Sequence, residues 1–424
     1  MPVSAYVPTR AEIRCARIPI DFLAVATVSF ACGTAAGPWV VGALSGYFYQ
    51  PSVLALTHTF ALGWMTAAMM GVMYRYVPAL THGSLPYPRL LMPQLVLYVI
   101  GASGMVSHFA LGSWSGIWSA ALVVIASVAL FAANIYPLLW PRAGRGVAET
   151  GMFLALCFLL IAAALGFLLA FDKSYGFLGG SVISNLESHA HLAAVGWVTL
   201  TICSISYRLV PALTLPEIRL PKSAAWQLYA LAGGVIGLAV TLLARVPGVA
   251  VWSVAIATAL MAYIITMARL VWTHRKPIDW SVRHAIGAIA WLMVAIAMGI
   301  TLALMGTESE LGARIASGYG VAGILGWFGN FIIGISYYLF PGFVIRARSL
   351  QRWRPMGAAE ISTQQLRSIV FGAFNFGLVL VVAGLLASRI GVCVIGAIAI
   401  AMGGLMYSTA TMWTLSFAYR RGEA

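Results

Sequence analysis

Four histidines of this sequence lie at similar depths inside apolar segments, where a polar ring is costly. His58 and His191 each lie six residues into a long apolar segment, His189 precedes His191 by two residues, and His108 lies near the end of another segment. Neutral imidazole is the commonest metal ligand in proteins, and two facing histidines can hold a haem iron. Ionisable residues within membrane-spanning segments mark functional sites by default. We therefore interpret His58, His108, His189 and His191 as candidate metal or haem ligands.

The spacing of His189 and His191 predicts that they serve two different interfaces. Two residues on a helix are separated by about 200°, so the two rings must face different neighbours. The alternative is a set of buried histidines that hydrogen-bond to the backbone or to Glu187. One histidine would favour that alternative, whereas four at one depth favour ligation. The chain has no CxxCH motif, so a haem here would be haem b, held noncovalently.

The elements that carry these histidines are predicted to span a membrane. The chain has 424 residues, of which 61% are hydrophobic and only 8% charged, whereas soluble proteins are typically about 25% charged. This composition excludes soluble, disordered and disulfide-rich secreted classes. At about 20 apolar residues per helix, the sequence predicts twelve spans: Phe22–Val41, Ser52–Val77, Leu90–Leu111, Ser115–Leu139, Thr150–Phe171, Asn185–Val210, Ala224–Ala244, Val249–Val271, Val282–Leu304, Ala313–Phe340, Leu366–Ala387 and Ile390–Phe417.

The basic residues predict the orientation of these spans. All but four of the 25 Lys and Arg residues lie in the two tails and in the loops after even-numbered spans; the exceptions are Lys173, Arg245, Arg314 and Arg389. The positive-inside rule then places both termini in the cytoplasm of a bacterial-type inner membrane and the four histidines toward the periplasmic face. It also explains the net charge of +14 without a nucleic-acid partner. His82, His274 and His284 are predicted to lie in solvated cytoplasmic loops.

An internal repeat divides the single membrane domain into three units. The pairs Gly63-Trp64, Gly196-Trp197 and Gly326-Trp327 recur at steps of 133 and 130 residues, each followed by a tyrosine and a proline at fixed offsets. The units cover approximately 1–145, 146–279 and 280–424. Each contains four spans, so all three have the same orientation, which predicts pseudo-threefold symmetry about the membrane normal. We expect the tryptophan to fill the gap beside the glycine and the proline to close the helix.

The repeats differ at the histidines. The position twenty residues before the proline is His58, His191 and Val321 in turn; the position two residues earlier is Leu56, His189 and Tyr319. Arg245 and Arg389 occupy equivalent loops on the histidine side, where they could pair with haem propionates or with lipid headgroups. For Glu187 and Tyr319 we favour an interfacial role over proton relay.

The chain resembles subunit I of the haem–copper oxygen reductases and nitric-oxide reductases. The residues that carry the resemblance are His189-Ala190-His191 with Tyr207-Arg208-Leu209-Val210-Pro211, which look like the family's His-x-His helix, and the run Gly71 to Pro78, which looks like its Gly-Met-Tyr-Tyr helix end. In that family one histidine of the pair holds the high-spin haem and the other the low-spin haem. However, the His-x-His helix here is the sixth instead of the tenth, no adjacent His-His pair for copper is present, and no histidine follows His284.

These departures exclude a full oxidase with a bis-histidine haem and a haem–copper centre. We expect a haem-b-binding membrane redox protein that serves electron transfer or small-gas (NO, O2) chemistry, with His58 paired to His189 or His191 and His108 nearby. The alternative is a five-coordinate haem beside a histidine-ligated metal, which would be copper or another metal ion. Two other functions stay open: a non-catalytic structural or electron-relay subunit of a larger membrane complex, and a metal-ion transporter. The expected partners are the lipid bilayer, a quinol or periplasmic electron carrier, and other membrane subunits.

Overall fold

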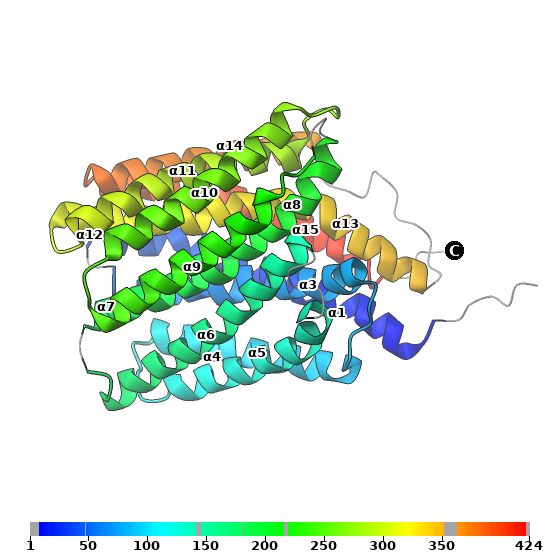
Figure 1. Ribbon diagram of the computed structural model, residues 1–424, viewed down its shortest axis with the longest axis horizontal. Helices are drawn as coiled ribbons and strands as arrows, with labels where there is room; N and C mark the ends of the chain where they lie inside the picture. Colours follow the sequence, from blue (N-terminus) through cyan, green and yellow to red (C-terminus); the bar gives the residue numbers. More distant parts are fainter. Residues whose placement is uncertain are drawn as a thin grey trace, which may run out of the picture.

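The computed structural model describes residues 8–46, 48–140, 146–179, 181–215, 219–351 and 363–420. Over these ranges the chain is a bundle of helices that run roughly along one direction (Figure 1), and twelve helical segments are long and apolar enough to cross a membrane. The predicted all-α membrane fold with twelve transmembrane helices is confirmed. Five of the basic residues used to predict orientation, Arg142, Arg145, Arg352, Arg354 and Arg421, lie outside the described residues.

The helices are longer than hydropathy alone predicts, because several continue into polar sequence at their ends. The first third of the chain contains α1 (Arg10–Val40), η1 (Val41–Ser45), α2 (Pro51–His58), η2 (Thr59–Thr66), α3 (Ala67–Thr81), η3 (Pro88–Leu90), α4 (Leu91–Ala110) and α5 (Ile117–Leu139). The second contains α6 (Val147–Tyr175), α7 (Val182–His191), η5 (Leu192–Thr199), α8 (Leu200–Thr214), α9 (Ser223–Ala244) and α10 (Val249–Trp272). The third contains α11 (Trp280–Met305), α12 (Glu310–Val321), η6 (Ala322–Gly329), α13 (Asn330–Leu350), α14 (Gln364–Leu386) and α15 (Ile390–Ser416).

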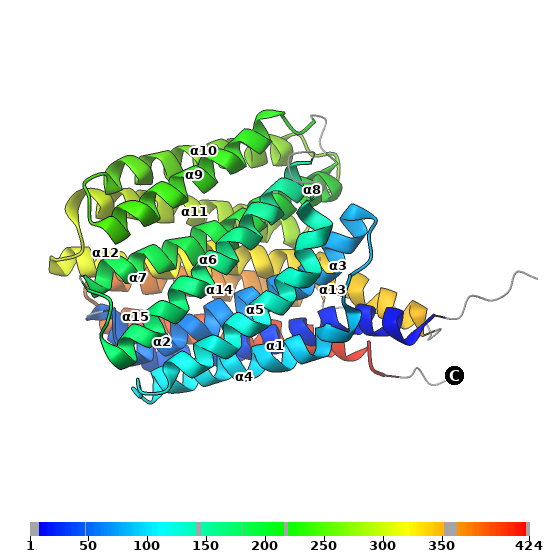
Figure 2. The same cartoon turned by 60° about the horizontal axis from the view of Figure 1, so that its bottom comes forward.

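The three thirds of the chain form a closed ring. Helix α5 packs along α6, α10 packs along α11, and α1 packs along α15, so each third contacts the other two. Helix α1 begins and α15 ends at the same end of the bundle (Figure 2). We call the opposite end, where α2, α7 and α12 begin, the distal end. That the distal end faces the periplasm stays a prediction from the charge distribution.

Three spans are interrupted by an eight-residue π-helical segment. The segments η2, η5 and η6 begin directly after His58, His191 and Val321, which are the equivalent positions of the sequence repeat. A π-helix hydrogen-bonds each residue to the fifth one along, and such segments are rare and frequent at functional sites. The sequence predicts regular helices here, because hydropathy does not report hydrogen-bond register.

The prediction that a proline closes each of these helices is wrong. Pro78, Pro211 and Pro341 all lie inside α-helices. A proline removes one backbone donor and strains one turn, and near the end of a long packed helix this does not stop propagation. Helices α3 and α8 are capped at their C-terminal ends by His82 and Leu215, which have positive φ angles of 50° and 45°.

The prediction that each tryptophan of the repeat fills the gap beside its own glycine is wrong. A Cβ atom added to Gly196 would lie 2.5 Å from the ring of Phe158, so the preceding span fills that gap. Gly326 is covered in the same way by Trp291. The glycines therefore let the first two spans of a third approach closely.

The tryptophan indoles instead reach the neighbouring third of the chain. Trp197 Nε1 donates a hydrogen bond to Thr66 Oγ1 at 3.2 Å, and Trp327 Nε1 donates to Thr199 Oγ1 at 3.4 Å. Trp64 occupies the corresponding place over Gly329, which has no hydroxyl to offer. The last residue of each π segment is thus contacted by a tryptophan from another third of the chain.

Candidate functional site

His58 is the last residue of α2, and its ring is held in one tautomer. Its Nδ1 lies 2.8 Å from the carbonyl oxygen of Leu54. A carbonyl only accepts hydrogen bonds, so Nδ1 carries the proton and Nε2 of the neutral ring keeps a free lone pair. The ring packs against Phe109 of α4, with ring centroids 4.5 Å apart and the planes tilted by 32°. His58 therefore offers an oriented nitrogen ligand in an apolar setting.

His191 ends α7 in the same way that His58 ends α2. Its Nδ1 donates to the carbonyl oxygen of Glu187 at 2.7 Å, which leaves the lone pair on Nε2. That nitrogen lies 3.4 Å from the hydroxyl of Tyr319 on α12, and the two rings are nearly parallel. His191 therefore faces the third part of the chain, where the tyrosine hydroxyl can donate to it.

His189 faces the opposite direction, toward the first third of the chain. It lies close enough to His58 for the two rings to interact electrostatically. Its ring packs on α6, where a Cβ atom added to Gly166 would lie 2.8 Å from its Cε1 atom. Its Nδ1 is buried and forms no hydrogen bond of good geometry, although the backbone of Ala162 on α6 lies close enough to interact with the ring. A buried polar atom without a partner is costly and calls for a ligand or an ordered water.

These contacts assign a different pair to each of two interfaces. The interface between the first and second thirds has His58 with His189, and the interface between the second and third has His191 with Tyr319. At the corresponding positions of the remaining interface the sequence has Val321 and Leu56, which carry no polar side-chain atom.

His108 lies apart from the other three histidines. Its Nδ1 donates to the carbonyl oxygen of Ser113 in the loop after α4, at 2.9 Å, and its ring covers Gly116. The described residues contain no group of three or more His, Cys, Asp or Glu side chains arranged to hold a metal ion. The four histidines therefore do not converge as one cluster, because equal depth along the membrane does not imply that the rings face each other.

The two arginines predicted for haem propionates are both exposed. Arg245 is exposed, and its guanidinium donates to the carbonyl oxygen of Gly179 at 2.8 Å. Arg389 is exposed at the start of α15. Neither contacts a histidine among the described interactions. Glu187 contributes its backbone carbonyl to His191, and Tyr319 contacts His191, so an interfacial role alone does not describe Tyr319.

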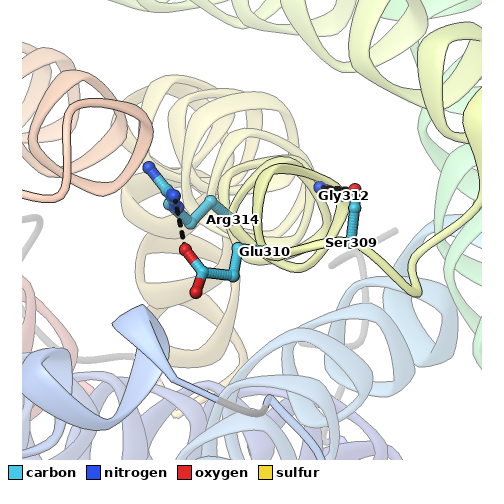
Figure 3. Close-up of polar contacts among 4 residues, drawn as sticks. All are labelled: Ser309, Glu310, Gly312 and Arg314. Atoms are coloured by element: carbon cyan, nitrogen blue, oxygen red, sulfur yellow. Dashed lines mark hydrogen bonds and ion pairs between the residues drawn. The ribbon is translucent and has the colours of Figure 1, made fainter.

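The start of α12, which positions Tyr319, is fixed by its own side chains (Figure 3). Ser309 caps the helix by accepting a hydrogen bond from the backbone N–H of Gly312 at 3.0 Å. One turn into the helix, Arg314 pairs with Glu310 at 3.1 Å. An exposed ion pair of this kind contributes at most about 1 kcal/mol to stability. The position of α12 is therefore determined mainly by its N-cap and by its packing.

The predicted loop position of His284 is wrong. Helix α11 begins at Trp280, and the side chain of His284 is fully buried, with 0% exposure. Its Nδ1 lies 3.1 Å from Oδ1 of Asn330 on α13. Asn330 and Asn375 of α14 exchange two hydrogen bonds of 2.9 and 3.0 Å, and Trp291 Nε1 donates to Asn375. His82 and His274, in contrast, are exposed as predicted.

Replacing Asn330 by leucine tests whether this network stabilises the bundle. The change removes the partner of His284 Nδ1 and both hydrogen bonds between Asn330 and Asn375, whose amide keeps only the Phe371 carbonyl and the Trp291 indole. We therefore expect the free energy of unfolding to fall by about 1–3 kcal/mol. Thermal unfolding in detergent measures it. Thr409→Val is the control, because that exposed hydroxyl bonds only to the carbonyl of Leu405 in its own helix. Equal melting temperatures for both variants would contradict the prediction.

Comparison with solved structures identifies the fold. The chain superposes on a chain of a haem–copper terminal oxidase dimer solved by cryo-electron microscopy, with a TM-score of 0.67, 13% sequence identity, and coverage of 96% of this chain and 84% of that one. At this identity the likeness establishes the fold alone, that of a haem–copper oxidase subunit I. No family model matches the sequence, and a search of curated proteins finds no relative.

Proposed function

We propose that this chain is a haem-b-binding membrane redox protein that holds the haem iron between His58 and His189. The observation that supports the proposal is that these two rings lie close enough to interact electrostatically across the interface of the first and second thirds of the chain. The haem–copper oxidase fold supports a redox role in a membrane.

The residues present fit a haem. The His58 ring is oriented by the Leu54 carbonyl so that Nε2 is a free ligand. His189 has a buried ring nitrogen that forms no hydrogen bond of good geometry. Gly166 adds no side chain beside the His189 ring, and Phe109 provides an aromatic wall beside His58. Two neutral imidazoles in an apolar interior match the ligands of a noncovalent b-type haem.

A haem bound here would supply one-electron exchange with a membrane or soluble partner. The Leu54 carbonyl holds the His58 ring in one orientation, and both rings lie half-buried among the helices of the bundle. His58 and His189 would both hold the iron, and a haem held by two histidines suits electron transfer better than gas chemistry. We therefore favour a relay that exchanges electrons with a quinol, a periplasmic carrier or another membrane subunit.

Visible spectroscopy of the purified protein tests this proposal. A reduced-minus-oxidised spectrum, a pyridine haemochrome assay and metal analysis should find haem b, no binding of carbon monoxide, and iron in proportion to haem. Binding of carbon monoxide would indicate an open iron position and favour small-gas chemistry. Absence of a Soret band would refute the proposal. Copper or another metal without haem would favour the metal-site or transport alternatives.

A further inference from the structure

Lys173 is a half-buried cation at the distal end of α6. Its Nζ atom lies 4.4 Å from the ring centroid of Tyr49 and 4.9 Å from that of Trp114. Lys173 forms no ion pair with a carboxylate among the described residues. The neighbouring Asp172 accepts a hydrogen bond from the backbone N–H of Leu178. Contacts with two rings stabilise an ammonium less than an anion would. The positive charge of Lys173 is therefore not neutralised by these contacts, and an anion could bind to it.

A chain of aromatic contacts connects Lys173 to His58. Trp114, whose ring lies beside the ammonium, packs edge-on against Phe109 with ring centroids 6.0 Å apart. Phe109 in turn packs against the His58 ring, with centroids 4.5 Å apart. Lys173 therefore lies at the distal edge of the wall that borders the His58 ring.

Helix α6 connects the same lysine to His189. Gly166 of this helix lies against the His189 ring. Lys173 follows Gly166 by seven residues, which is about two turns, so both residues lie on one face of α6 about 10 Å apart along its axis. Lys173 is thus connected to His58 through aromatic contacts and to His189 through helix α6, and it lies nearer the distal end.

We propose that Lys173 binds a carboxylate of the group held by His58 and His189, namely a propionate of the haem. Haem carries its two carboxylates on one edge of the ring, and an ammonium at the mouth of the site is a matching partner. This inference rests on the proposed function. We favour Lys173 over Arg245 and Arg389 as a propionate partner, because Arg245 is bonded to the Gly179 carbonyl and both arginines are exposed.

The test compares Lys173→Gln and Lys173→Arg in the full-length protein. A charge-assisted hydrogen bond contributes enough that Lys173→Gln should release haem to an acceptor protein about tenfold faster than wild type, whereas Lys173→Arg should release it at nearly the wild-type rate. The midpoint potential of Lys173→Gln should shift to a lower value, because losing a nearby cation favours the oxidised iron. Arg245→Gln and Arg389→Gln are matched controls and should change neither quantity.

Reconstitution with haem dimethyl ester separates the propionate from other anions. Esterification removes the carboxylate charge, so Lys173→Gln and wild type should then release the haem at the same rate. If the protein contains haem but Lys173→Gln leaves both release and potential unchanged, the inference is overturned; a lipid phosphate as the partner would give this result. If the wild-type protein contains no haem, the proposed function itself fails.

Discussion

Replacing either His58 or His189 by alanine is expected to abolish the six-coordinate haem spectrum. Each variant removes one of the two nitrogen ligands, and loss of groups that only orient a ligand already lowers metal affinity about 10–100-fold. We therefore expect haem content to fall by at least that factor, or the remaining haem to bind carbon monoxide. Absorption spectra of the purified variants, normalised to protein, measure both outcomes.

His191→Ala is the matched control for this experiment. His191 lies two residues from His189 on the same helix, is half-buried like it, and is held by the Glu187 carbonyl. Its Nε2 faces Tyr319 of the third part of the chain instead of His58. The variant should therefore keep the six-coordinate spectrum. If His191→Ala loses the haem while His189→Ala keeps it, the assignment of the pair is wrong.

The fold class could be predicted from the sequence, because apolar length determines whether a helix can span a bilayer. The twelve spans follow from that rule alone. The different directions of His189 and His191 also follow from helix geometry, since two residues always turn a helix by about 200°. What could not be predicted is hydrogen-bond register: no residue type signals that a π segment begins directly after His58.

Side-chain partners from distant parts of the chain were also beyond the sequence. The predicted span Val282–Leu304 already includes His284, which contradicts its prediction as a loop residue. Its hydrogen-bond partner Asn330, 46 positions away, could not be predicted. From the sequence, Lys173 is only one of the four basic residues on the side of the membrane with few of them. Its contacts with two aromatic rings could not be predicted, because those rings lie in two loops of another third of the chain. His108 shares the predicted depth, yet the carbonyl of Ser113 directs its ring elsewhere.

Trp197→Ala is expected to lower the stability of the bundle more than any other single change at the interfaces between the thirds. The indole of Trp197 is 1% exposed and reaches from the second third to the first. Removing a buried tryptophan costs about 3–5 kcal/mol in protein cores. Thermal unfolding in detergent, followed by circular dichroism, should show a clear fall in melting temperature.

A pair of phenylalanine variants separates the hydrogen bond of this tryptophan from its volume. Trp197→Phe removes packing and a bond to Thr66, whereas Trp64→Phe removes similar packing over Gly329, where no hydroxyl accepts a bond. The first variant should therefore be less stable than the second by about 0.5–1.5 kcal/mol, the net contribution of one hydrogen bond. Thr66→Val should cost a similar amount, because it removes the acceptor of the same bond. Equal losses for the two phenylalanine variants would show that the indoles stabilise the ring of helices by packing alone.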